Sequence, residues 1–179
     1  MSRAHFKLDQ LDRRFRLISP GMWVLELGAA PGGWTAYLES RLGPSGRLIV
    51  CDSRPVHAGA DTVVVSGHFG DAVVDEAIAG ALGDRGVDLV LSDMSPNITG
   101  IRTRDQAETL DLAELAMAAA ERWLKPGGVL VVKMFMGEGT DAWIRQIGKK
   151  FAKIRRAKPD ASRQESREIY VVGQQFLAQ

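Results

Sequence analysis

Short apolar runs alternate along this chain with longer stretches in which apolar residues recur at helical spacing. Five of the runs are rich in Val, Ile and Leu and predict buried strands, at 22–27, 47–52, 61–66, 87–93 and 128–135. The longer stretches predict helices at 33–42, 71–83, 105–124 and 139–152. Two more strands are expected near the end of the chain, at 151–159 and 167–176.

This order of elements predicts an α/β fold with a doubly wound, mostly parallel seven-stranded sheet flanked by helices. No helix separates the last two strands, so we expect them to pair as an antiparallel hairpin at one edge of the sheet. We expect residues 1–179 to form a single domain. In such folds ligands bind beyond the carboxyl ends of the strands, which directs attention to polar residues there.

Cysteine and histidine usage limits the chemistry. Cys51 is the lone cysteine, so no intrachain disulfide can form, and His5, His57 and His68 show no metal-ligand spacing. No run approaches the roughly 18 apolar residues of a membrane span, and the first residues lack the apolar core of a signal peptide. We therefore expect a cytoplasmic protein with no metal and no membrane contact.

Charge is segregated along the chain, although the formal net charge is only +1. Residues 145–167 hold nine Lys or Arg against two Asp or Glu, and residues 1–16 hold five against two. Residues 17–144, in contrast, hold nine against seventeen. The pattern favours a basic surface for a polyanion beside an acidic body, the alternative being a solvated face that only keeps the protein soluble.

The loop LGAAPGGW (27–34) follows the first strand and carries glycines that allow a sharp turn. A dinucleotide-binding loop would read G-x-G-x-x-G, but Ala30 stands at the second glycine's position. Asp52 ends the next strand, 24 residues beyond Gly28, where an acid can accept hydrogen bonds from ribose hydroxyls. The combination suits S-adenosylmethionine, which has a ribose and a carboxylate but no pyrophosphate. A purely structural turn is the alternative.

Lys133 is the stronger signal, because an ionised lysine near the end of a central apolar strand is costly unless it is paired or faces a cleft. Asp93 ends the preceding strand in the same way. Neighbouring strands lie roughly 5 Å apart, so these two side chains are expected to interact. A structural ion pair at a strand end is the alternative to a functional one.

Five segments taken together resemble the FtsJ/RrmJ (RlmE) family of ribosomal RNA ribose 2'-O-methyltransferases. They are SRAHFKLDQLD, LGAAPGGW, SDMSPN, VVKMFMGEG and KPDASRQESREIYVVG, in order over essentially the whole chain. The resemblance implies a Rossmann-like class I methyltransferase fold and S-adenosylmethionine as cofactor. It implies as substrate a ribose 2'-hydroxyl of large-subunit ribosomal RNA, a uridine of the A-loop in the bacterial branch. It also suggests a monomer with no obligate protein partner.

The resemblance also assigns roles to residues. The family's catalytic Lys-Asp-Lys-Glu tetrad falls on Lys7, Asp93, Lys133 and Glu168. Its cofactor contacts fall on Gly32, Trp34, Asp52, His68 and Asp93. At His68 the family commonly has an aspartate, so either His68 or the nearby Asp71 would contact the adenine, the alternative being that His68 is an ordinary surface residue.

Two other functions compete with ribose methylation. Asp93 and Pro96 in DMSPN suggest methylation of a base amino group, but the D-P-P-[YW] spacing is lacking and Lys133 would have no role. A non-catalytic, RNA-binding ribosome-assembly factor is the third hypothesis, which retention of the whole tetrad disfavours. In ribose methylation Lys133 would either act as a base or only orient the hydroxyl.

Overall fold

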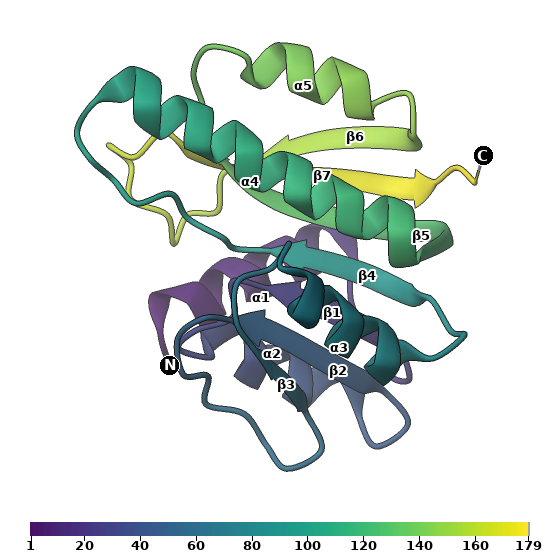
Figure 1. Cartoon of the computed structure of the whole chain (residues 1–179). Helices are drawn as coiled ribbons and strands as arrows, with labels where there is room; N and C mark the ends of the chain where they lie inside the picture. Colours follow the sequence, from purple (N-terminus) through teal and green to yellow (C-terminus); the bar gives the residue numbers. More distant parts are fainter. Residues whose placement is uncertain (179) are drawn as a thin grey trace.

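The computed structural model describes residues 1–178, and its seven strands form one sheet in the order β3-β2-β1-β4-β5-β7-β6 (Figure 1). The strands are β1 (Trp23–Leu27), β2 (Arg47–Asp52), β3 (Val63–Ser66), β4 (Val87–Ser92), β5 (Leu124–Phe135), β6 (Phe151–Ala157) and β7 (Glu168–Phe176). The helices are α1 (Arg3–Phe15), α2 (Gly33–Leu42), α3 (Ala72–Leu82), α4 (Arg102–Trp123) and α5 (Thr140–Ile147). The first five strands are parallel, and β7 runs antiparallel to both of its neighbours.

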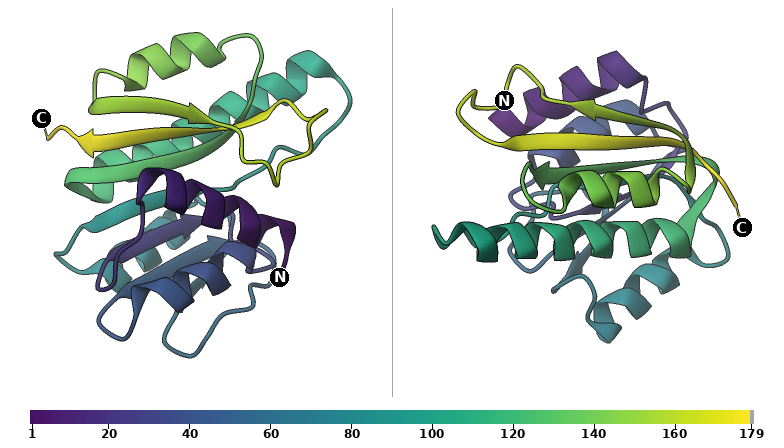
Figure 2. Two further views of the ribbon diagram at one scale, coloured as in Figure 1. Left: turned by 180° about the vertical axis from the view of Figure 1, so that it is seen from behind. Right: turned by 90° about the horizontal axis from the view of Figure 1, so that it is seen from above.

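The sheet separates two layers of helices. Figure 1 shows α3, α4 and α5 on one face, and Figure 2 shows α1 and α2 on the other. Each layer packs its own apolar core against the sheet, one centred on residues such as Ile78 and Met117, the other on Leu8 and Leu38. The expected doubly wound α/β fold is confirmed.

The end of the chain forms the expected antiparallel pair, and the register explains its place. Strand β7 inserts between β5 and β6, so β6 is the edge strand and Lys133 of β5 lies directly opposite Tyr170 of β7. This insertion brings the start of β7, with Glu168, to the carboxyl end of β5.

One helix and two element boundaries differ from the expectation. Helix α1 is an additional element, amphipathic but so polar that only Leu8, Leu11 and Asp12 are buried. Strand β5 begins at Leu124 rather than at 128, because the stretch expected to be a turn continues the pairing past a register shift. Helix α5 ends at Ile147 rather than at 152, since Gly148 caps it and the edge strand starts at Phe151.

Strand order reverses between β1 and β4, and the crevice at this switch point is where ligands of such sheets bind. Gly28, directly after β1, has φ +73° and lies so close to Met94 that an added Cβ would be 2.7 Å from its backbone nitrogen. The two loops that leave β1 and β4 therefore pass each other at the crevice, which requires glycine at this position.

Helix α1 is fixed to α2 and to the segment that follows α1 by a buried carboxylate near its end. Asp12 is 4% exposed and accepts hydrogen bonds from the backbone N–H groups of Leu17 and Ile18 at 3.0 and 2.9 Å. The Tyr37 hydroxyl of α2 donates to its other oxygen at 2.8 Å. A buried acceptor satisfied from three sides holds α1 in one orientation. This matters for the site, because α1 carries Lys7.

No helix within residues 1–178 is long and apolar enough to cross a bilayer.

Glu26 is a carboxyl group inside the sheet, on β1 below the glycine-containing loop. It is 1% exposed, and the Thr35 hydroxyl donates to it at 2.8 Å. Burial raises its pKa from 4.5 to about 8, because the charged form is poorly solvated there. The unfolded chain therefore loses this proton at lower pH than the folded chain does.

We predict that Glu26→Gln removes a pH-dependent loss of folding stability. Between pH 4.5 and 8 wild type is progressively destabilised, because only its unfolded state ionises readily, and the glutamine variant escapes this loss. In urea unfolding, the free energy of unfolding of the variant relative to wild type should increase by up to about 4 kcal/mol from pH 4.5 to pH 8. Below pH 4.5 this difference should not change with pH. Exposed Glu76→Gln serves as control and should show no such gain. A Glu26→Gln gap independent of pH would contradict the assignment.

Candidate active site

Lys133 and Asp93 form an ion pair at the carboxyl ends of β5 and β4, as their positions in the sequence predict. The Lys133 Nζ lies 3.2 Å from Asp93 Oδ1 and donates to the Asp93 backbone oxygen at 3.0 Å. The lysine side chain is only 8% exposed, whereas that of Asp93 is 22% exposed. The ammonium group is thus enclosed on the protein side, and the pair is open on the side of Asp93.

Tyr170 completes this pair from the neighbouring strand. It is fully buried, and its hydroxyl donates to Asp93 Oδ1 at 3.0 Å. Its ring packs against Trp34, with 5.6 Å between ring centroids. The side chain of Trp34 therefore belongs to the core and supports Tyr170, which in turn orients Asp93.

Lys7 and Glu168 form a second ion pair, with 2.6 Å between Nζ and Oε1. Their side chains are 15% and 11% exposed, so little water screens the pair. The Ser162 hydroxyl donates to the same carboxylate oxygen at 3.1 Å. This contact joins α1, the start of β7 and the loop that precedes β7.

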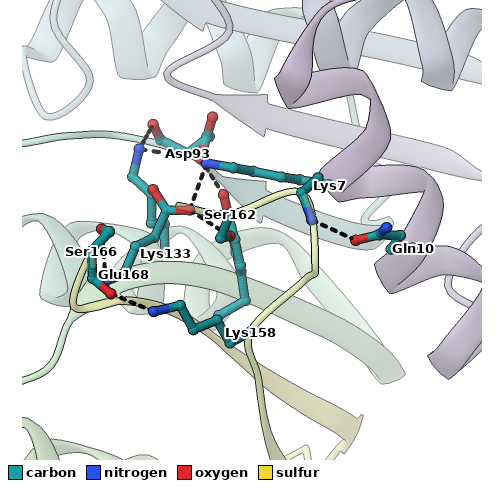
Figure 3. Close-up of polar contacts among 10 residues, drawn as sticks. Lys7, Gln10, Asp93, Lys133, Lys158, Ser162, Ser166 and Glu168 are labelled. Carbon is teal, nitrogen blue, oxygen red and sulfur yellow. Dashed lines mark hydrogen bonds and ion pairs between the residues drawn. The ribbon is translucent and has the colours of Figure 1, made fainter. Parts of the chain in front are cut away.

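The two ion pairs lie in one cluster. Figure 3 shows Lys7, Asp93, Lys133 and Glu168 directed toward one another from α1, β4, β5 and β7. The structure thus brings together all four residues of the proposed tetrad, which lie up to 161 positions apart in the chain.

Electrostatics in the cluster are dominated by desolvation. Burial raises the pKa of Asp93, the facing Glu168 raises it further, and Lys133 and Tyr170 act in the opposite direction. Burial also raises the pKa of Tyr170, so that its hydroxyl remains a donor. A site with two lysines and two carboxylates is balanced in charge and can tolerate a positive charge that develops next to the carboxylates.

A cleft of about 410 Å³ opens beside Asp93, within the range typical of small-molecule sites. It lies at the switch point, bordered by residues from the ends of β1, β2, β3 and β4. Among the predicted contacts, the lining includes Asp52, His68 and Asp93. Gly28, Phe69, Met94 and Leu112 also border it.

Asp52 is held ionised at one end of this cleft. Burial alone would raise its pKa, but hydrogen bonds from the Arg54 side chain and backbone and from the Ala30 N–H lower it below the usual value. Oδ2 accepts from Ala30 at 2.9 Å and Oδ1 from Arg54 at 2.8 Å. The carboxylate keeps acceptor capacity for a further donor such as a ribose hydroxyl.

Gly32 and Trp34 do not border the cleft in this structure. Gly32 has φ +124°, and a Cβ there would lie 2.5 Å from the His57 backbone oxygen, so this glycine permits a close contact between two loops. Both residues nevertheless stand at the start of α2, where the first backbone bond of the helix runs from Ala36 to Gly32. The N–H groups of the first turn are therefore available to an anion, and contact through the backbone stays a prediction.

The two candidates for the adenine contact differ in their position relative to the cleft. His68 is exposed and borders the cleft, whereas Asp71 does not and stands at the N-terminus of α3. Asp71 instead donates its backbone N–H to the His68 oxygen at 3.1 Å. No group of three or more His, Cys, Asp or Glu residues in the range 1–178 is arranged to hold a metal ion.

Two site residues were not anticipated from the sequence alone. Tyr170 alternates with apolar neighbours in EIYVVG and looks like an ordinary strand residue. Ser162 lies in a polar loop. Strand register could have identified Tyr170. When β7 pairs with β5 so that Glu168 reaches the site, Tyr170 lies opposite Lys133.

A sheet whose strand order reverses between β1 and β4, with a cleft at that switch point, is an arrangement that binds nucleotide-like ligands. The family model described as FtsJ-like methyltransferase matches residues 1–176. The chain therefore belongs to the FtsJ-like methyltransferase family.

Individual relatives agree with this. A ribosomal RNA large subunit methyltransferase E of Cellvibrio japonicus is 46% identical over 176 residues, which are 98% of this chain and 83% of the relative. A structure described as a ribosomal RNA methyltransferase of Plasmodium falciparum superposes with a TM-score of 0.90 at 24% identity, covering 99% of each chain. Fibrillarin of Aeropyrum pernix, with bound S-adenosyl-L-methionine, gives a TM-score of 0.66 at 14% identity over 96% of this chain and 76% of its own. The two structural matches show the fold alone.

We predict that Tyr170→Phe raises the pKa of Asp93, because the hydrogen bond that it removes lowers that pKa. A carboxyl ¹³C NMR titration measures the shift, and methyl transfer should fall roughly tenfold, as expected for loss of one hydrogen bond to a charged group. Tyr37→Phe removes a similar hydroxyl, bonded to Asp12 on α1, and should leave the Asp93 titration unchanged. Identical titrations of Asp93 in wild type and Tyr170→Phe would refute the positioning role.

Proposed function

We propose that this methyltransferase transfers a methyl group to a ribose 2'-hydroxyl of large-subunit ribosomal RNA, at a uridine of the A-loop. The observation that carries the proposal is the pairing of Lys133 with Asp93 and of Lys7 with Glu168 beside the cleft. The Cellvibrio japonicus relative, which is named as a large-subunit ribosomal RNA methyltransferase, supports the class of RNA.

The cleft residues fit S-adenosylmethionine. The ionised Asp52 would accept from the ribose hydroxyls, and the exposed His68 would face the adenine. The first backbone N–H groups of α2, at Gly33 and Trp34, would hold the carboxylate. When bound, the cofactor supplies a methyl group already activated by the positively charged sulfur.

We propose that Lys133 positions the substrate hydroxyl. Its ammonium already donates to the backbone oxygen of Asp93 and lies beside the carboxylate, so a remaining N–H is free to bond the ribose oxygen. As the methyl–sulfur bond breaks and its electrons stay on the sulfur, the new bond to this oxygen would place positive charge on the hydroxyl until its proton passes to solvent. The carboxylates of Asp93 and Glu168 stabilise that charge and favour loss of the proton.

We further propose that residues 1–179 act as a single-domain monomer in the cytoplasm, without an obligate protein partner. One continuous sheet contains every strand described between residues 1 and 178, which supports a single folding unit. A ribosomal RNA substrate supports the cytoplasmic location. Methylation of a base amino group and RNA binding without catalysis remain the competing functions.

The decisive experiment transfers a labelled methyl group to RNA and maps the product. Wild type is incubated with undermethylated large subunits, with naked ribosomal RNA and with free nucleosides, and the labelled nucleotide is identified by mass spectrometry. We predict label on a ribose 2'-oxygen. Lys133→Met should lower the rate at least 100-fold, because general acid–base and positioning groups typically contribute that much.

Lys125→Met provides a matched control. Lys125 also lies on β5 and also pairs with an aspartate of β4, Asp88, at 3.3 Å, but at the opposite end of the strand. This variant should keep most of its activity. Label on a base nitrogen would replace ribose methylation by the amino-group alternative, and transfer to no RNA would favour the assembly factor.

A further inference from the structure

In the half of the sheet formed by β5, β7 and β6, the edge strand β6 is covered by a helix on one face only. Helices α4 and α5 cover that face, whereas on the opposite face α1 lies beside these strands and leaves β6 bare (Figure 2). Side chains of β6 therefore divide between a covered and an open face. Arg156 points to the covered face and pairs with Asp141 of α5 at 2.7 Å.

Arg155 and Lys153 point to the open face. Arg155 lies opposite Val172, a residue of the core beneath α1, and Lys153 lies opposite Gln174. Directly paired side chains point to the same face of a sheet. Both cations are exposed, and they lie on the same side of the sheet as the end of α1.

Three arginines meet in a hollow of about 340 Å³ between α1 and this open face. Its lining residues are Arg14, Phe15 and Arg16 at the end of α1, Arg155 of β6 and Gln174 of β7. Gln174 Nε2 donates to the Phe15 backbone oxygen at 3.4 Å and fixes the base of the hollow.

The cations of this hollow are not neutralised. Within residues 1–178 the structure gives Arg14, Arg16 and Arg155 no ion pair with a carboxylate, and Arg14 lies over the Phe15 ring at 5.1 Å. Like charges brought together repel, and an anion bound among them would relieve that repulsion.

A second hollow of about 390 Å³ adjoins the first and reaches Gln10, one helical turn from Lys7. It shares Arg14 with the first and is bordered by Gln10 of α1 and by Lys158 and Asp160 of the loop after β6. Figure 3 shows Gln10 on the same helix as Lys7, and its side-chain oxygen accepts from the Ala161 N–H at 3.1 Å.

Positions 7, 10 and 14 lie on one side of a helix. Lys7, Gln10 and Arg14 therefore lie in a row on α1, with Arg14 about 10 Å from Lys7 along the helix axis.

We infer that the hollow formed by Arg14, Arg16 and Arg155 binds phosphate groups of the RNA strand whose ribose enters the active site. This inference rests on the proposed function. Guanidinium groups bind phosphate oxygens through two parallel hydrogen bonds, and such contacts fix an RNA in place without reading its sequence. The open sheet face next to the hollow leaves room for a backbone that a covering helix would exclude.

The same geometry divides the basic segment 145–167. Arg145 on α5 and Lys149 just after it are exposed, but they belong to the helix layer on the other side of the sheet. The inference assigns RNA binding to the Arg155 side alone. These two residues therefore provide a control with the same change in charge.

The test compares Arg14→Gln/Arg155→Gln with Arg145→Gln/Lys149→Gln. Arg16 is left in place because its backbone has φ 55°, which would confound a substitution there. Binding of undermethylated 23S ribosomal RNA is measured from 50 to 200 mM salt, with methyl transfer, affinity for S-adenosylmethionine and melting temperature recorded for each protein. Loss of two phosphate contacts lowers the slope of log affinity against log salt by about 1.5 to 2.

We expect Arg14→Gln/Arg155→Gln, the hollow variant, to show that decrease in slope and a KM for RNA raised roughly tenfold. Its kcat at saturating RNA and its affinity for the cofactor should be unchanged. The α5 variant should stay within twofold of wild type. Wild-type slope and KM in the hollow variant, or an equal loss in the α5 variant, would overturn the inference while leaving methylation intact. Wild type that neither binds nor methylates ribosomal RNA would instead overturn the proposed function.

Discussion

The requirement that buried charge be paired governs the site. Lys133 has 8% of its side chain exposed at the end of an interior strand, where an unpaired ammonium would be prohibitively costly. Asp93 neutralises it, and Tyr170 saturates the same carboxylate oxygen. Tyr170 packs against Trp34, so a residue of the glycine-containing loop supports the proposed catalytic pair through packing. The core and the chemistry are therefore not separable here.

The second ion pair depends on where the ends of the chain lie. Lys7 is on the first helix and Glu168 begins the last strand, and they meet only because β7 inserts next to β5 while α1 crosses the same face. Asp12 fixes α1 through three hydrogen bonds. The same helix then continues toward the hollow around Arg14, so one rigid element joins the reacting groups to the proposed path of the RNA.

Much of the fold and part of the candidate site could be predicted from the sequence. The other features depend on strand register and on tertiary contacts. Runs of Val, Ile and Leu predicted five of the seven strands, and the last two were predicted as a hairpin near the end of the chain. The cost of a lysine in such a run indicated Lys133 and its partner Asp93. Helix α1 was missed because its few apolar residues are scattered among charges.

Tyr170 was missed because its role arises only when β7 is placed against β5. The basic segment 145–167 was identified as one feature, but the alternation of side chains along β6 sends Arg155 and Arg156 to opposite faces. The assignment of cofactor contacts to Gly32 and Trp34 depends on a backbone approach that side-chain positions do not reveal.

The central claim is that the two ion pairs act as one unit. A double-mutant cycle with Lys133→Met and Glu168→Gln, measured as single-turnover methyl transfer at saturating cofactor and RNA, tests it most directly. Residues that act together are strongly non-additive, so the double variant should be about as slow as the slower single variant. Losses that multiply, so that the double variant is slower by the product of the two single effects, would contradict the claim.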